Sequence, residues 1–261
     1  MNTVSKQERS TNVLAYLERN PLQNIMSLKM LQTFRSDINT FYVEGGALLL
    51  LPTKAYWYDA KTYPESEFVV FLNTDNPDVT RQLIQHIPKG VNLIFKLIKA
   101  HDQIVLVEYY SLTRIIGFES YTASKASTAQ AWPDVVITDQ LDHRLVPLFA
   151  ENGYGPETLE RYLNKNQGLT FSIFQAENPV ATCLAFLNYG QVWEIGGLYT
   201  IPDARRQGLG KRIVETGVKT LLDHNYVLRY QMHEENIPSM RLAEAIGLDH
   251  FLTVTHFKSY P

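Results

Sequence analysis

The first stretch of the chain, residues 6–34, has its apolar positions at helical spacing, and Asn20-Pro21 interrupts the series. Side chains three to four residues apart share one face of a helix, and proline ends a helix, so this pattern predicts two helices. The apolar positions are Val13, Leu14, Leu17, Leu22, Ile25, Met26, Leu28 and Leu31.

Short apolar runs come next, at residues 48–51, 55–58 and 68–71, with glycine and proline between them. Runs of this length bounded by such residues favour strands, so we expect an antiparallel meander. The residues Asp75-Asn76-Pro77 then predict the start of a helix that continues to residue 87. Two more strands are expected, at residues 91–97 and 115–121.

Small and polar residues fill positions 122–130. This composition is typical of a linker. We therefore expect an N-terminal α/β domain at residues 1–130 and a second domain at residues 131–261.

The second domain is predicted to contain two helices followed by an antiparallel meander, which gives a mixed α/β fold. The turns of the meander are expected at Asn178-Pro179 and Tyr189-Gly190. The predicted helices are residues 139–149 and 156–165, and the predicted strands are residues 135–138, 169–175, 180–188 and 192–200.

A loop with two glycines follows the strand at residues 192–200. It runs from Pro202 through Arg205, Gly208 and Gly210 to Lys211, and a helix with one apolar stripe comes next. Glycines let the backbone approach an anion closely, and free N–H groups at a helix N-terminus favour phosphate. The loop therefore predicts a phosphate site.

This loop differs from two common phosphate-binding motifs at positions where those motifs need a particular residue. A Walker loop needs glycine where Arg205 stands and Ser or Thr where Arg212 stands. A dinucleotide fingerprint needs a third glycine where Ile213 stands. The sequence thus excludes a P-loop and disfavours dinucleotide binding.

A second pattern lies downstream, after a strand predicted at residues 226–232. Asn236 suits a helix N-cap, Pro238 suits the first turn, and Gly247 suits the left-handed residue that ends a helix.

Together the two patterns resemble the GNAT superfamily of N-acetyltransferases, over about residues 135–260. Arg205, Gly208 and Gly210 fill the family pattern Gln/Arg-x-x-Gly-x-Gly/Ala, and Asn236 and Ser239 fill the start of the second one. The resemblance implies a GNAT fold, with a mixed, mostly antiparallel central sheet flanked by helices. Residues 198–202 are most similar to the glycine N-acyltransferase-like branch, which implies a degenerate GNAT-like N-terminal half. No second phosphate loop occurs at residues 73–99.

The resemblance also implies acetyl-CoA as co-substrate, without a metal, and transfer of an acetyl or short acyl group to a primary amine of a small molecule or amino acid. In the family the loop holds the pyrophosphate, and the preceding strand offers a backbone N–H to the reacting oxygen. The coenzyme A-binding residues that it implies are Leu198, Tyr199, Thr200, Arg205, Arg206, Gln207, Gly208, Leu209, Gly210, Lys211, Asn236 and Ser239.

An amine attacks a thioester only as the free base, so the reaction needs a proton acceptor. Glu194 lies fourteen residues before Gly208, the offset at which lysine-acetylating members of the superfamily place their general base. The alternative is a charged residue on a solvated strand face. His233 could titrate near neutral pH and assist catalysis, or be a hydrogen-bonded surface group. Ala243 replaces the family's usual tyrosine acid, which leaves water, Ser239 or a nearby tyrosine to protonate the thiolate.

Composition limits the binding partners and the cellular location that we expect. The formal net charge of -3 gives no global field that would attract nucleic acid or an anionic membrane. Cys183 is the only cysteine, so no intrachain disulfide can form. The N-terminus lacks the apolar core of a signal peptide, and no apolar run approaches the roughly 18 residues of a membrane span. We expect a cytoplasmic protein.

Two other functions fit the same residues. A non-catalytic acyl-CoA-binding regulatory module is suggested by Ala243, and a protein-lysine or N-terminal acetyltransferase would differ only in its acceptor.

Overall fold

The computed structural model describes residues 6–124, 127–163 and 167–261. Packing divides the chain into two compact units. Unit 1 comprises Met1–Phe118 and Leu252–Pro261, and unit 2 comprises Glu119–Phe251. The chain first passes from unit 1 to unit 2 between Phe118 and Glu119, which lies before the linker expected at residues 122–130. Residues 125 and 126 of that expected linker lie outside the described part of the chain.

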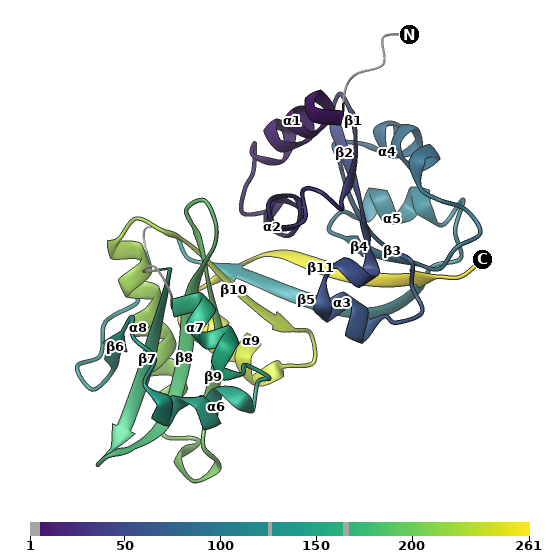
Figure 1. Ribbon diagram of the computed structural model, residues 1–261. Helices are drawn as coiled ribbons and strands as arrows, with labels where there is room; N and C mark the ends of the chain where they lie inside the picture. The colour runs from purple at the N-terminus through teal and green to yellow at the C-terminus, as the bar shows by residue number, and fades with distance from the viewer. Residues whose placement is uncertain (1–5, 125–126, 164–166) are drawn as a thin grey trace. The chain divides into compact units, whose positions relative to one another are not determined.

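Unit 1 begins with the two expected helices and continues with a sheet and three further helices (Figure 1). Its elements are α1 (Lys6–Leu17), α2 (Ile25–Thr33), β1 (Asn39–Val43), β2 (Gly46–Pro52), α3 (Trp57–Thr62), β3 (Phe68–Thr74), α4 (Pro77–Leu83), β4 (Leu93–Leu97), α5 (Ala100–Leu106), the first part of β5 (Thr113–Thr122) and the last part of β11 (Asp249–Ser259).

The strands of unit 1 are hydrogen-bonded in the order β1-β2-β3-β4-β11. The first three form an antiparallel meander, β4 lies parallel to β3, and β11 lies antiparallel to β4. Residues 48–51 of β2 are buried one after another because helices pack on the sheet, which explains their unbroken apolar run.

The strand expected at residues 55–58 does not form. A 3-10 turn occupies Thr53–Ala55, and α3 begins at Trp57. Pro52 ends β2, and the helix that follows carries Asp59 to the ammonium group of Lys96. A tertiary ion pair therefore favours a helix in a segment whose aromatic residues predicted a strand.

This ion pair is buried in unit 1. Lys96 Nζ lies 2.6 Å from Asp59 Oδ1, and the two side chains are 5% and 0% exposed. Burial raises the pKa of Asp59 and lowers the pKa of Lys96, while their mutual attraction opposes both shifts. Nearby, the Tyr63 hydroxyl lies 2.6 Å from Nδ1 of His256. Burial lowers the pKa of His256 to about 2, so the ring is neutral.

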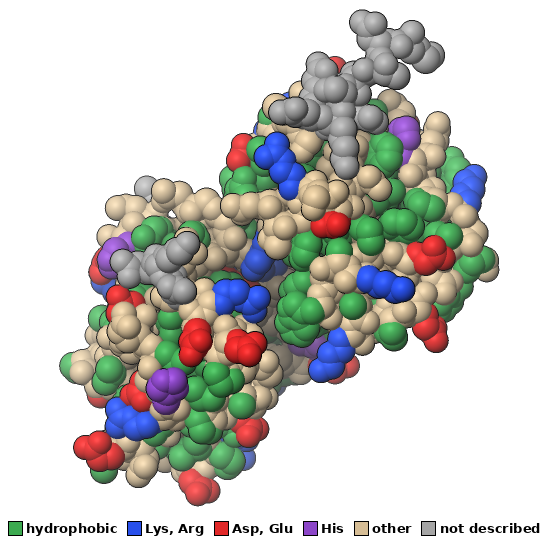
Figure 2. Space-filling model, viewed as in Figure 1, with side chains coloured by type: hydrophobic (Ala, Val, Ile, Leu, Met, Phe, Trp, Pro, Cys, Tyr) green, Lys and Arg blue, Asp and Glu red, His purple; other side chains and the backbone are tan. Residues whose placement is uncertain are grey.

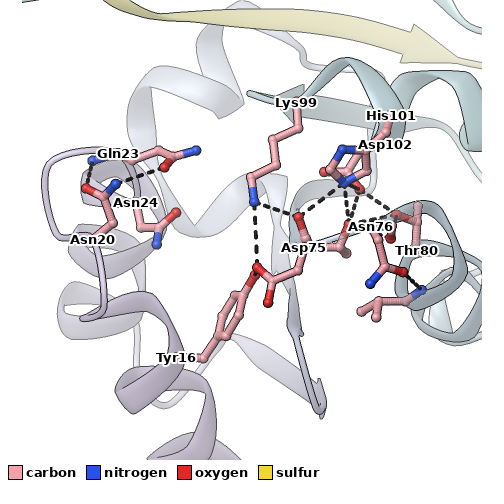
Figure 3. Close-up of polar contacts among 12 residues, drawn as sticks. Tyr16, Asn20, Gln23, Asn24, Asp75, Asn76, Thr80, Lys99, His101 and Asp102 are labelled. Carbon is pink, nitrogen blue, oxygen red and sulfur yellow. Dashed lines mark hydrogen bonds and ion pairs between the residues drawn. The ribbon is translucent and has the colours of Figure 1, made fainter.

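A second polar cluster stands at the carboxyl end of β3 (Figure 3). Asp102 is fully buried, and its Oδ1 accepts hydrogen bonds from the hydroxyls of Thr74 (2.6 Å) and Thr80 (2.7 Å). The Asn76 side chain caps α4 by accepting from two backbone N–H groups of its first turn. The protein itself therefore satisfies these donors at the start of α4.

Unit 2 contains the predicted meander as β7, β8 and β9, and the fold class expected from the sequence is confirmed: the sheet is mixed, mostly antiparallel and flanked by helices. Its elements are the last part of β5, β6 (Val136–Thr138), α6 (Val146–Ala150), α7 (Pro156–Leu163), β7 (Gly168–Gln175), β8 (Asn178–Tyr189), β9 (Val192–Thr200), α8 (Leu209–Asp223), β10 (Val227–His233), α9 (Ile237–Ala245) and the first part of β11.

Some predicted boundaries in unit 2 are wrong. The helix expected at residues 139–149 is a 3-10 turn followed by the short α6, because Asp142 caps the backbone N–H of Arg144 and starts the helical segment there. The first turn of the meander lies at Ala176 and Glu177, so Asn178 already begins β8. The predicted helix at 156–165 ends at Leu163, and its last two positions lie outside the described residues. The sequence did not predict α5 or β11.

The parallel pairing of β9 with β10 ends in mid-strand. It runs from Val192↔Val227 to Ile195↔Tyr230, whereas β9 continues to Thr200 and β10 to His233. The register of β9 against β8 also shifts here, at Gly197, which has a φ of 63°. A bulge of this kind bends a strand and interrupts its ladder. The last residues of β9 are accordingly half-exposed.

Helices cover the two faces of this sheet (Figure 1). The buried face of α8 packs with Ile195 and Trp193 of β9 in one apolar cluster. On the other face, α6 and α7 pack with Leu184 and Phe186 of β8 in a second cluster. Alternate residues of β9 therefore face different helices.

We predict that Lys96→Met destabilises the protein by about 3–5 kcal/mol, because it leaves the Asp59 carboxylate buried and unpaired. The double variant Lys96→Met/Asp59→Asn should recover most of this loss, since no uncompensated charge remains. Urea unfolding at pH 7 measures both effects. Losses that add in the double variant would show that the two side chains stabilise the fold independently.

Candidate active site

The loop between β9 and α8 exposes backbone N–H groups. Arg206 and Gly208 have φ values of 62° and 76°, and left-handed residues of this kind arrange neighbouring N–H groups into a concave anion site. Gly208 is the N-cap residue of α8, and no side chain caps this helix end. A Cβ at Gly208 would meet no atom within 4 Å, so the backbone angle rather than crowding requires glycine.

This helix start lies against the end of β9, beyond the point where β9 pairs with β10. A Cβ at Gly210 would lie 3.7 Å from Leu198 and 3.9 Å from the hydroxyl of Thr200. The Leu209 side chain is buried in the core, so only its backbone can serve a ligand. The phosphate loop predicted from the sequence and the predicted strand segment 198–200 therefore come together.

The basic side chains of the loop differ in whether they form hydrogen bonds or ion pairs within the protein. Arg205 Nε donates to the carbonyl of Thr200 at 3.0 Å, and Lys211 and Arg212 are each paired with an acidic residue. Arg206 forms no hydrogen bond or ion pair with any described residue. Arg206 is thus the loop cation that can take a phosphate without giving up a partner.

Two predicted coenzyme A-binding residues contribute in other ways. The Gln207 side chain donates to the carbonyl of Asp203 at 3.3 Å, which closes the loop on itself. The Tyr199 ring lies beneath the Arg205 guanidinium, 5.7 Å from its centroid, and so fixes the direction of that arginine.

The second predicted pattern forms α9 as expected. Asn236 Oδ1 accepts from the backbone N–H of Ser239 at 3.2 Å, and Gly247 has a φ of 72°. Burial raises the pKa of Tyr230 to about 12, and the neighbouring Ser239 side chain opposes this rise. Ala243 is fully buried in the core, so this position contributes no side chain to a site.

Glu194 lies on the other face of β9, opposite the face that α8 covers. Asn188 Nδ2 donates to its Oε2 at 2.6 Å, and Arg229 Nη1 donates to the same oxygen at 2.5 Å. The side chains of Glu194 and Arg229 are 17% and 6% exposed. Glu194 is therefore a half-buried, paired carboxylate rather than a residue on a solvated face.

Aromatic side chains of α7 and its preceding loop line this face. The Tyr162 ring stacks on Phe186 with centroids 4.1 Å apart. Burial, and secondarily the charge of Glu194, raise the pKa of Tyr162. The Tyr154 hydroxyl lies 3.2 Å from the position of a Cβ at Gly196. The carboxylate thus stands beside an apolar wall at the point where β9 leaves β10.

His233 ends β10, and its side chain is 38% exposed. Its Nδ1 accepts from the backbone N–H of Glu235 at 3.2 Å. Among the described residues no hydrogen bond joins His233 to Glu194, so the structure does not bring the two predicted catalytic residues into direct contact.

The sequence prediction missed Asn188, Arg229 and Tyr162. One signal was present for Arg229, a charged residue between the apolar Leu228 and Tyr230 of a predicted strand, because a charge inside a buried strand requires a partner. Asn188 and Tyr162 had no comparable signal, because their roles depend on strand register and helix packing.

The model of the acetyltransferase (GNAT) family matches residues 138–248, which include β9, the loop, α8 and α9. Residues 138–248 are therefore similar to the acetyltransferases of the GNAT family. The match contains every residue proposed from the sequence for coenzyme A binding or catalysis.

Solved structures with this fold cover both units. An acetyltransferase from the GNAT family of Colwellia psychrerythraea matches with a TM-score of 0.64 and 11% identity, over 100% of this chain and 98% of that one. A GCN5-related N-acetyltransferase from Kribbella flavida matches with a TM-score of 0.61 and 16% identity, over 90% and 94%. A tandem GNAT protein from the clavulanic acid biosynthesis pathway matches with a TM-score of 0.54 and 9% identity, over 98% and 96%. The search of curated proteins finds no match.

The described residues include no helix that is long and apolar enough to cross a membrane. They also include no group of three metal-ligating side chains that could hold an ion. Acidic and basic side chains are interspersed on the face of the molecule in Figure 2.

We predict that Gly208→Asp weakens coenzyme A binding at least about tenfold, because a carboxylate would repel phosphate at the uncapped helix end. Gly190→Asp is a matched control, since Gly190 also has a positive φ and open space around it but lies in the β8–β9 turn. Calorimetry with coenzyme A compares the two folded variants. Equal affinities would place the phosphates elsewhere.

Proposed function

We propose that this protein is an acetyl-CoA-dependent N-acetyltransferase that acts on a primary amine of a small molecule or amino acid. The observation that carries the proposal is the uncapped N-terminus of α8 beside the end of β9, where β9 no longer pairs with β10. Helix N-termini attract phosphate, and an unpaired strand end offers backbone groups to an extended ligand.

The residues present fit coenzyme A. The N–H groups of Gly208, Leu209, Gly210 and Lys211 would hold the pyrophosphate, and the side chain of Arg206 would neutralise a phosphate charge. The backbone of Leu198, Tyr199 and Thr200 would hold the pantetheine arm and the thioester oxygen, and Asn236 and Ser239 would contribute from the start of α9. Acetyl-CoA, when bound, supplies an activated thioester carbonyl.

Glu194 is proposed as the group that takes the proton from the acceptor ammonium, directly or through one water. A carboxylate beside an apolar wall also attracts the cationic amine to the site. His233 remains a proposal as an assisting group, supported by its half-exposed place at the end of β10.

Ser239 is proposed to donate a hydrogen bond to the departing thiolate, which takes its proton from water. Its hydroxyl is half-exposed at the start of α9, and the buried Tyr230 hydroxyl stands behind it. A thiol, with a pKa near 8.5, needs little help to leave. This hydrogen bond could partly replace the acid that Ala243 lacks.

Unit 1 is proposed as a degenerate GNAT half of the glycine N-acyltransferase-like type. Both units contain an antiparallel meander, a helix, a strand parallel to the last strand of the meander, and a second helix. In unit 1, however, the Asn76 side chain already fills the first turn of α4, and Asp75 and Asp102 lie beside it (Figure 3). We infer that each chain binds one coenzyme A, in unit 2.

The proposal also includes two domains, at residues 1–130 and 131–261, and a cytoplasmic location.

A second candidate is a non-catalytic acyl-CoA-binding module. The buried Ala243 and the engagement of Glu194 by Arg229 favour it, because both reduce the acid–base groups that are free to react. A protein-lysine or N-terminal acetyltransferase would use the same groups on a larger acceptor.

We predict that the wild-type protein acetylates at least one member of a panel of amines and amino acids, and that Glu194→Gln lowers its rate about a hundred- to ten-thousand-fold. Glutamine still accepts the hydrogen bonds of Asn188 and Arg229, so acetyl-CoA affinity should not change. The loss should shrink as pH rises toward the pKa of the amine, where free base is abundant. Steady-state rates at pH 6.5 to 9.5, roughly the span below that pKa, measure this.

A wild-type protein that binds acetyl-CoA but acetylates no amine would support the binding module. Equal rates of the wild type and Glu194→Gln at every pH would remove Glu194 from the mechanism while leaving the transfer intact.

A further inference from the structure

The carboxylate of Glu194 is held by one oxygen. Asn188 Nδ2 and Arg229 Nη1 both donate to Oε2, at 2.6 and 2.5 Å. Oε1 accepts no hydrogen bond from any described residue, and it is not among the described buried polar atoms that lack a partner. The two oxygens of one carboxylate therefore have different surroundings.

Resting on the proposed function, we propose that Asn188 and Arg229 are positioning residues that anchor Glu194 through Oε2 and present Oε1 to the acceptor amine. Neither residue touches the reacting atoms in this proposal. Both act through the geometry and charge of Glu194.

The register of the strands places Arg229 for this task. Arg229 and Glu194 are partners in the parallel β9–β10 pairing, one position before that pairing ends at Ile195↔Tyr230. The anchor thus stands beside the point where the strands stop pairing. Gly196, two residues after Glu194, lies about 7 Å further along β9. An amine at this point is within reach of Oε1 directly or through one water.

A strand irregularity places Asn188. The β8–β9 register shifts between Leu187 and Tyr189, so Asn188 is the extra residue opposite β9. Bulges re-aim side chains, and this one carries the Asn188 amide to Glu194. Its Oδ1 is buried and accepts no hydrogen bond from a described residue, so among these residues only the Nδ2 group of the amide has a partner.

Charge explains why an arginine is retained in a buried position. Arg229 is 5% exposed, and burying a guanidinium costs free energy unless a carboxylate compensates it. Glu194 supplies that compensation through Oε2, and Arg229 in turn keeps the carboxylate in one orientation. Groups that fix a reacting side chain lower the cost of reaching productive geometry.

A structural role of the same ion pair predicts different kinetics. If Arg229 only stabilises the fold, its loss lowers the amount of folded protein but not the activity of each folded molecule. If it acts through Glu194, its loss lowers turnover only while Glu194 can accept a proton. A double-mutant cycle separates the two cases.

The experiment compares kcat/KM of full-length Arg229→Met, Asn188→Ala, Glu194→Gln and the two doubles with Glu194→Gln, using the best amine of the panel. Outer groups of this kind contribute about 10- to 100-fold, so we expect Arg229→Met to lose that much and Asn188→Ala to lose less. In the Glu194→Gln background, either change should cost less than about twofold. Acetyl-CoA affinity, measured by calorimetry, should stay constant throughout.

Arg229→Lys keeps the charge but not the shape of the guanidinium, and should recover part of the rate. Arg144→Met is the control, since it removes an arginine paired with Asp142 in the same unit, on a different segment. This variant should keep full activity.

Losses that multiply in the doubles, or full activity of folded Arg229→Met and Asn188→Ala, would overturn the positioning role while leaving the acetyltransferase proposal in place. If Arg229→Met does not fold, Asn188→Ala and Arg229→Lys decide the question by the same cycle. A wild type that acetylates no amine would overturn the proposed function and this inference with it.

Discussion

The end of the β9–β10 pairing is the feature on which the rest of the site depends. Up to Ile195↔Tyr230 the two strands satisfy each other's backbone groups, and beyond that point the last residues of β9 pair on the β8 side, around the bulge at Gly197. The first turn of α8 lies beside this stretch of β9, where Gly210 approaches Leu198 and Thr200. An extended ligand with a phosphate at one end matches this combination of an open strand and an uncapped helix.

The two faces of β9 have different roles in the proposed site. Residues that face α8, such as Ile195, belong to the apolar core and fix the helix whose N-terminus forms the phosphate loop. Glu194 faces α6 and α7, where Tyr162 and Phe186 form an apolar wall beside the Arg229 ion pair. Strand alternation thus places the phosphate-binding helix on one side and the charged group for the acceptor on the other.

Local signals in the sequence predicted much of this arrangement. Gly208, Asn236 and Gly247 each occupy the backbone position that their residue type favours, and the meander follows from short apolar runs. Interactions between distant residues could not be predicted in the same way. The Arg229–Glu194 pair depends on strand register, Asn188 on a one-residue bulge, and α3 on the burial of Asp59 against Lys96. The return of Leu252–Pro261 to unit 1 likewise follows from β11 pairing with β4, a contact between residues far apart in the chain.

The most direct test of the account is amide hydrogen exchange of the full-length protein with and without acetyl-CoA. We predict that the ligand protects the backbone amides of residues 198–200 and 206–211, and leaves the exchange of residues 74–80 in unit 1 unchanged, because Asn76 already satisfies that helix start. Protection at residues 74–80, or no protection at residues 206–211 at saturating acetyl-CoA, would contradict it.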